Sequence, residues 1–232
     1  MMKDINKFKK NILNSELVRP SWIKQVHRSS NKQWLDKNEC ADQILNSIVL
    51  ECLSNIPPES VFSYPELDLL YAKIARFSKV QADNILITAG SDGAIRACFE
   101  TCIEPGDRII LTRPTFAMYD VYSKIYDAEV IWVDYSPSEN GPLLTVDTLI
   151  SVIKEVEPKM VCLPNPDSPT GTIFSPDDLE KIIKTAGEVG AFMLIDEAYH
   201  PIYRWTAVPL INIYNHLIVV RSFSKAWGSA GL

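Results

Sequence analysis

The sequence predicts a three-layer α/β fold, with a mostly parallel sheet covered by helices on both faces. Short apolar runs rich in β-branched residues alternate with longer amphipathic segments between residues 85 and 221. Proline, glycine and acidic residues that begin or end helices fall between those runs. The chain has 232 residues, 47% of them hydrophobic, which is enough to bury one large core. Such alternation is typical of βαβ units, whose strands run parallel.

The expected elements follow one another in a regular order. Strands are expected at residues 85–88, 108–112, 129–133, 160–163, 192–195 and 217–221, and helices at 91–103, 116–126, 146–156 and 176–189. The last helix has the clearest start, because Ser175 is a good N-cap, Pro176 suits the first helical position, and acidic residues follow. Helical patterns at 44–53 and 65–77 precede the alternating region.

Composition narrows the function classes. The net charge is -6 and no Lys/Arg run suggests nucleic-acid binding. No stretch is apolar for long enough to cross a bilayer, and the N-terminus lacks the apolar core of a signal peptide. We therefore expect a cytoplasmic protein without nucleic-acid or membrane partners. The five cysteines form no C-x-x-C motif and are expected to be reduced, buried thiols, and the three histidines are not spaced to bind a metal.

Two loops that follow expected strands suit a ligand. Gly90, Ser91, Asp92 and Gly93 open a helix, where free backbone N–H groups favour a phosphate. Alone, such a turn is more often only a turn. Residues 164–171 hold three prolines among small polar residues, which predicts a rigid loop at a strand end. The alternative reading is a connection with no ligand.

Two further strand ends carry reactive groups. Asp196 follows an apolar strand, where a buried acid would want a cationic partner such as a protonated pyridine nitrogen; the alternative is an acidic cap, shared with Glu197. Lys225 lies among small hydroxylated residues after another strand, as a Schiff-base lysine does, although a lone loop lysine is more often a surface residue. Because parallel strands end at one edge of a sheet, the four segments together predict one site.

On these motifs the chain resembles the fold-type-I pyridoxal-phosphate-dependent aminotransferases of class I/II, and among them the histidinol-phosphate aminotransferase branch. The resemblance runs from about Leu35 to Leu232 and is carried by residues 90–92, 114–119, 169–171, 196–199 and 224–232. It implies that residues 39–232 form the large cofactor-binding domain, incomplete at its C-terminal end, after an N-terminal segment at 1–38. We expect the small C-terminal domain of the family to be missing from this chain.

The resemblance also implies pyridoxal 5′-phosphate as the cofactor and assigns roles around it. Lys225 would form the Schiff base and carry a proton, Asp196 would pair with the pyridine nitrogen, and Tyr199 would hydrogen-bond the phenolic oxygen. Phe116 would stack on the ring, while Ser168 stands where the family donates to the phenolic oxygen. The phosphate would be held by Ser91, Asp92, Gly93, Ser222 and Ser224, and by Tyr64 from the partner subunit of a homodimer.

Departures from the family pattern bear on the reaction. Ser168 and Asp167 stand where asparagines are usual, and the family's phosphate-binding arginine would fall at position 233. We therefore expect a fragment, inactive or poorly folded as a 232-residue chain. The implied reaction moves an amino group between an amino acid or amino-phosphate, histidinol-phosphate-like, and a 2-oxo acid such as 2-oxoglutarate. The alternatives are a decarboxylase or lyase of the same family, threonine-phosphate decarboxylase-like, and a non-catalytic truncated relative.

Overall fold

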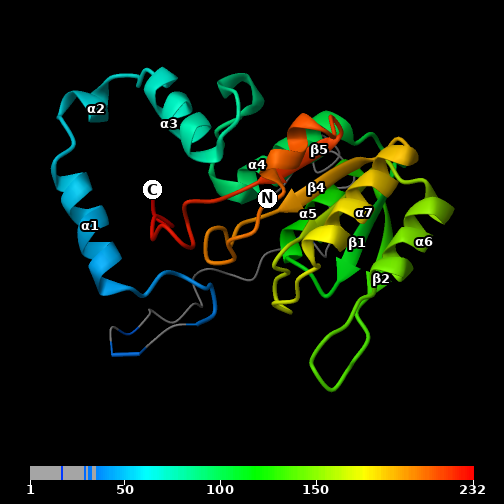
Figure 1. Ribbon diagram of the computed structural model, residues 1–232. Coiled ribbons are helices and arrows are strands. Elements are labelled where there is room, and N and C mark those ends of the chain that lie inside the picture. Colours follow the sequence, from blue (N-terminus) through cyan, green and yellow to red (C-terminus); the bar gives the residue numbers. More distant parts are fainter. Residues whose placement is uncertain (1–16, 18–28, 30, 33–34) are drawn as a thin grey trace, which may run out of the picture.

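A five-stranded parallel sheet lies between two layers of helices, in the right-hand part of Figure 1. The computed structural model describes residues 17, 29, 31–32 and 35–232, so most of the expected segment 1–38 lies outside the described residues. The strand order is β2-β1-β3-β4-β5, and every pairing is parallel. The strands are β1 Arg108–Arg113, β2 Glu129–Asp134, β3 Met160–Pro164, β4 Phe192–Asp196 and β5 Leu217–Val220.

Helices cover both faces of the sheet and make two cores. α4 (Gly90–Cys102) and α5 (Ala117–Tyr126) supply one face, and α6 (Val146–Val156), α7 (Pro176–Glu188) and the 3-10 helix η6 (Val208–Asn212) the other. In β1, Ile109 and Leu111 pack in the first core and Ile110 in the second, as alternation along a strand requires. The three-layer α/β fold predicted from the sequence is confirmed.

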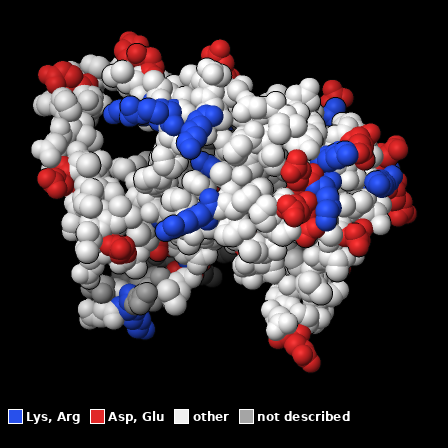
Figure 2. All heavy atoms as spheres, in the orientation of Figure 1, with Lys and Arg blue, Asp and Glu red and all other residues white. Residues whose placement is uncertain are grey.

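Three N-terminal helices form an arm beside the sheet. They are α1 (Gln43–Ser54), α2 (Glu59–Phe62) and α3 (Asp68–Ser78), followed by the short 3-10 helix η5 (Ala82–Asn84). None of the three arm helices has a buried residue. Figure 2 shows open space between part of the arm and the sheet body. The arm exposes large apolar side chains, among them Ile44, Leu50, Val61, Phe62 and Leu69.

The strand expected at residues 85–88 is wrong. The segment is not part of any sheet among the described residues. Two of its polar groups find partners outside any sheet: the Ile87 N–H donates at 3.2 Å to the Tyr71 hydroxyl, 16 positions away, and the Thr88 hydroxyl donates to the Gly90 carbonyl at 2.8 Å. A β-branched run predicts extended backbone, but a strand also needs a neighbour that completes its hydrogen bonds. The other expected elements agree within three residues at each end.

The structure also bears on the expectations for the cysteines and for membrane-spanning helices. All five cysteines are free, but only Cys162 is buried; Cys40, Cys98 and Cys102 are half-buried and Cys52 is exposed, so the expectation of buried thiols holds fully for Cys162 alone. Cys52 lies on α1, a helix with no buried residue. Across the described residues, no helix combines the length and apolar character needed to span a membrane.

Candidate functional site

The loops after β3, β4 and β5, which carry candidate residues, leave the sheet at its C-terminal edge. The strand register places Pro164 beside Asp196, and Asp196 beside Val220. Backbone bonds continue past the strand ends, from the Asn165 N–H to the Asp196 carbonyl at 2.9 Å and from the Glu197 N–H to the Val220 carbonyl at 2.8 Å. The proline loop, the acidic pair and the segment after β5 therefore start side by side. In open α/β sheets this edge is where ligands bind.

Asp196 is a buried acid without a cationic partner among the described residues. Its side chain is 5% exposed and accepts hydrogen bonds from the Tyr119 hydroxyl at 3.2 Å and the Ala198 N–H at 2.9 Å. Burial raises the pKa of the Asp196 carboxyl to about 6, although both hydrogen bonds act to lower it. A cation placed at this carboxylate would compensate the cost of its burial.

Glu197, the neighbouring acid, is already used by the fold. Its carboxylate is 2% exposed and accepts from the Arg221 Nε at 3.0 Å, the Thr206 hydroxyl at 2.8 Å and the Ala207 N–H at 2.6 Å. Burial raises the pKa of Glu197, and Arg221 opposes that rise. From the pattern of residues alone, either of the two adjacent acids could bind a ligand cation. In the structure Glu197 is paired with Arg221, so of these two acids only Asp196 is left for that role.

Polar groups for an anion gather at the start of α4. The helix has no side-chain N-cap, and its Gly90 N–H donates to the Thr88 carbonyl at 2.8 Å, so the N–H groups of Ser91 and Asp92 are the ones that remain for another partner. Gly90 has a φ of +67°, and a Cβ there would lie 3.6 Å from the Ser222 Oγ and 3.9 Å from the Ser224 Oγ. The two serine hydroxyls thus face the turn of Ser91 and Asp92 from a different segment. Asp92 itself accepts from the Tyr122 hydroxyl at 2.9 Å.

A pocket of about 500 Å³, called here the site pocket, brings Ser168 and Tyr199 together. Asp167 also lines it and is 2% exposed. Its carboxylate accepts from the Thr170 hydroxyl at 2.6 Å and the Thr115 hydroxyl at 3.3 Å. Burial raises the pKa of Asp167, and these hydrogen bonds oppose the rise. The other lining residues are Asn38, Pro166, Pro169, Gly171, Ile173, Ile202 and Tyr203.

Lys225 and Tyr199 both contact a turn that precedes the arm. The Lys225 Nζ donates to the Lys37 carbonyl at 2.5 Å, and the Asn38 Nδ2 donates to the Tyr199 hydroxyl at 2.7 Å. Lys225 does not line the site pocket. Nothing in the sequence pattern pointed to these contacts, which join residues 188 and 161 positions apart.

The remaining candidates lie in different surroundings. Phe116 is half-buried just before α5 and meets the Tyr119 ring edge-on, with ring centroids 6.2 Å apart. Tyr119 was not predicted as a site residue; the signal for it is a phenol on an apolar helix face, which needs a polar partner. Tyr64 is fully exposed between α2 and α3.

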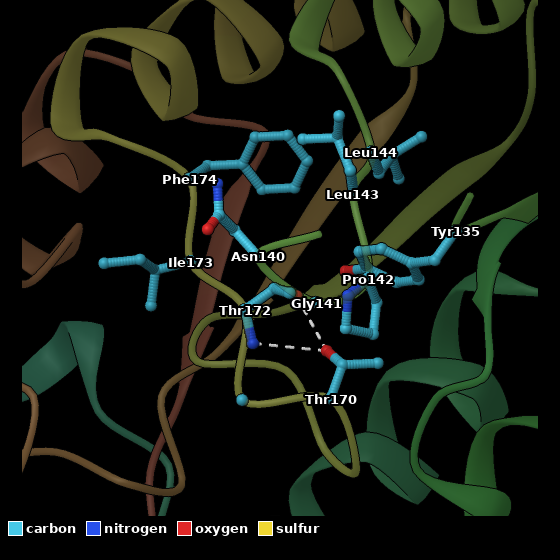
Figure 3. A pocket seen from close by; sticks show the side chains of 11 residues that line it. Tyr135, Asn140, Gly141, Pro142, Leu143, Leu144, Thr170, Thr172, Ile173 and Phe174 are labelled. Atoms are coloured by element: carbon cyan, nitrogen blue, oxygen red, sulfur yellow. Dashed lines mark hydrogen bonds between the residues drawn. The ribbon is translucent and has the colours of Figure 1, made fainter. Parts of the chain in front are cut away.

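A second pocket, of about 330 Å³, borders the proline loop on another side. Figure 3 shows Thr170 and Thr172 at its base, where the Thr172 N–H donates to the Thr170 hydroxyl at 3.2 Å. Tyr135, Leu144 and Phe174 make other parts of its wall. None of the candidate site residues lines this pocket, so the site pocket is the better candidate for binding.

The sequence is similar to those of known aminotransferases. The sequence model described as aminotransferase class I and II matches residues 30–232. A histidinol-phosphate aminotransferase of Thermoanaerobacter pseudethanolicus is 35% identical over 210 residues, which cover 90% of this chain and 58% of that protein. The chain thus spans little more than half the length of this curated relative.

Solved structures show the same fold. One is a histidinol-phosphate aminotransferase from Sinorhizobium meliloti in complex with pyridoxal-5′-phosphate, with a TM-score of 0.70 and 20% identity. The match covers 84% of this chain and 52% of that one. A PLP-dependent aminotransferase from Streptococcus suis matches with a TM-score of 0.65 and 29% identity, over 84% of this chain and 54% of that one.

Proposed function

The chain belongs to the class I and II aminotransferase family, and from this we propose that it binds pyridoxal 5′-phosphate and serves amino-group transfer. The single observation that carries the proposal is Asp196, a buried carboxylate at the ligand-binding edge with no cationic partner among the described residues. We propose residues 39–232 as the cofactor-binding unit, with Lys37 and Asn38 of the preceding segment at its margin.

The residues at this edge fit the chemistry of that cofactor. A carboxylate suits its pyridine nitrogen, and the uncapped start of α4 with two serine hydroxyls suits its phosphate. Gly90 leaves room that a side chain would reduce, since a Cβ there would contact both serines. When bound, the cofactor supplies an electron sink that stabilises negative charge on the substrate carbon next to the amine.

We assign the remaining proposed roles to individual side chains. We propose that Lys225 would hold the cofactor through its Nζ and move a proton there, for which it must leave the Lys37 carbonyl. Tyr199 and Ser168 share the site pocket and would bind the phenolic oxygen. Phe116 would cover one side of the ring. Ser91, Asp92, Gly93, Ser222 and Ser224 would hold the phosphate.

We propose an amino acid or amino-phosphate as the amino donor and a 2-oxo acid such as 2-oxoglutarate as the acceptor. The support is the 35% identity to a histidinol-phosphate aminotransferase. Decarboxylation and a non-catalytic role, the alternatives left open by the sequence, are outcomes of the same test.

We also propose that the active site is shared within a homodimer. The arm exposes apolar side chains over three helices, an arrangement that marks interaction surfaces. Tyr64 is fully exposed on the same arm, where a second copy could receive it.

The test uses the complete gene product with pyridoxal 5′-phosphate, histidinol phosphate as donor and 2-oxoglutarate as acceptor. We expect visible absorbance from the bound cofactor, its loss on adding donor, and glutamate formation. Lys225→Ala should abolish all three signals, whereas Lys184→Ala, a change of an exposed lysine on α7, should leave them unchanged. Release of CO2 without glutamate would contradict transamination, and a protein without visible absorbance would contradict cofactor binding.

A further inference from the structure

The Lys37–Asn38 turn contacts two residues of the proposed site at once. The Lys37 carbonyl accepts from Lys225, and the Asn38 amide donates to Tyr199. Asn38 has a φ of 54°, in the left-handed region that asparagine, aspartate and glycine tolerate best. The same residue lines the site pocket. Asn38 is therefore part of the pocket wall, although it precedes the arm in sequence.

The Asn38–Tyr199 bond fixes the direction of a second hydrogen bond. A phenol has one O–H donor, and its oxygen also accepts. Because the Asn38 Nδ2 donates to the Tyr199 oxygen at 2.7 Å, the Tyr199 O–H remains free to donate elsewhere. Both residues line the site pocket, so this proton is available to an acceptor there.

Few other groups in the site pocket could orient the Tyr199 hydroxyl. Among the residues that line it, Asn38 is the only side-chain amide. Asp167 cannot assist as a donor while ionised, and its carboxylate already accepts from Thr115 and Thr170. Ser168 offers only a short hydroxyl. Of the side chains that line the pocket, Asn38 is the one that hydrogen-bonds the Tyr199 hydroxyl, so the orientation of the Tyr199 proton depends on it.

We propose that Asn38 is a positioning residue, which keeps the Tyr199 hydroxyl as a hydrogen-bond donor toward an acceptor oxygen in the site pocket. The inference rests on the proposed function in one respect, because the acceptor would be the phenolic oxygen of the cofactor. It adds Asn38, which was not among the expected site residues, to a role already expected of Tyr199.

The test compares Asn38→Asp with Asn38→Gly. Aspartate has nearly the shape of asparagine and tolerates the same backbone conformation, but its carboxylate can only accept, so it draws the Tyr199 proton away from the pocket. Glycine keeps the conformation and removes the amide. Loss of one hydrogen bond predicts roughly three- to tenfold weaker cofactor affinity for Asn38→Asp, and a smaller loss for Asn38→Gly. If Asn38 only stabilised the fold, Asn38→Gly should weaken cofactor binding more than Asn38→Asp.

Two readouts besides activity decide the outcome: the dissociation constant of pyridoxal 5′-phosphate and the pH midpoint of the visible absorbance of the complex. A donor lost from an anionic oxygen makes nearby protons bind more tightly, so Asn38→Asp should raise the midpoint. In a Tyr199→Phe background, Asn38→Asp should add nothing. Asn84→Asp, the same change at an exposed asparagine of η5, is the matched control and should alter neither readout.

The outcomes separate the two proposals. If the unaltered protein binds no cofactor, the proposed function fails. If it binds the cofactor, and Asn38→Asp changes neither affinity nor midpoint while thermal melting shows both proteins folded, the positioning role is contradicted. An equal effect of Asn38→Asp in the Tyr199→Phe background would also contradict it.

Discussion

Asp196 and Glu197 show how adjacent acids acquire different roles. Arg221, Thr206 and the Ala207 N–H satisfy Glu197, whereas Asp196 receives only a phenol and one backbone N–H. Apart from the backbone N–H of Ala198, two positions from Asp196, these contacts join residues 9 to 77 positions apart in the chain. For this reason the sequence predicted a cation-binding acid at this strand end but could not predict that its neighbour is engaged.

Asp196 should make the cofactor-free protein less stable as the pH rises. Its pKa is raised from 3.8 to about 6, so the folded state binds the proton more tightly than the unfolded chain. This contribution to stability is complete below about pH 4 and is lost as the pH rises through 6, by about 3 kcal/mol. Asn at this position should shrink that slope, as measured by urea unfolding at pH 4.5 and 7.5. An unchanged slope in Asp196→Asn would contradict the assignment.

Removal of Arg221 should be far more costly than removal of a surface arginine. Arg221→Met leaves the buried Glu197 without its cation, at a cost of about 3–5 kcal/mol in the free energy of unfolding. Arg113→Met breaks the exposed pair with Asp134, in which both side chains are more than half exposed, and should cost less than about 1 kcal/mol. If denaturant titrations showed equal losses of unfolding free energy for the two variants, the Arg221–Glu197 pair would not be effectively buried.

At the scale of elements, the sequence predicted helices and strands best where the residue types themselves determine the local structure. The N-cap at Ser175 is present, with its hydroxyl accepting from the Asp178 N–H at 3.2 Å. Strand positions followed from apolar runs, because a parallel strand covered on both faces is apolar throughout. The failure at residues 85–88 and the unforeseen turn at Lys37–Asn38 depend on distant partners, which local pattern does not encode.

The Ser175 cap predicts a measurable loss of stability. Ser175→Ala leaves an N–H at the start of α7 without its acceptor and should lower the free energy of unfolding by about 1 kcal/mol. Ser47→Ala provides the control, because Ser47 lies exposed within α1 and alanine is the better helix former there. Chemical denaturation of both variants decides; a larger loss for Ser47→Ala would contradict the cap.

At the scale of the whole molecule, the sheet body and the arm differ in how they bury apolar surface. The body has two closed cores, whereas the arm leaves its apolar residues exposed. If the arm pairs with a second copy, Phe62→Asp should shift the complete gene product from dimer toward monomer in sedimentation experiments. Leu143→Asp, at an exposed apolar residue of a loop on the sheet body, should not. Monomers for all three proteins would contradict the dimer.

The central claim is that the C-terminal edge of the sheet holds pyridoxal 5′-phosphate through Lys225. Borohydride reduction of the protein–cofactor complex fixes the cofactor to its lysine, and peptide mass spectrometry locates the modified residue. We predict a phosphopyridoxyl group on the peptide that contains Lys225, and none in Lys225→Ala. Modification of a different lysine in the unaltered protein, or of none, would contradict the account.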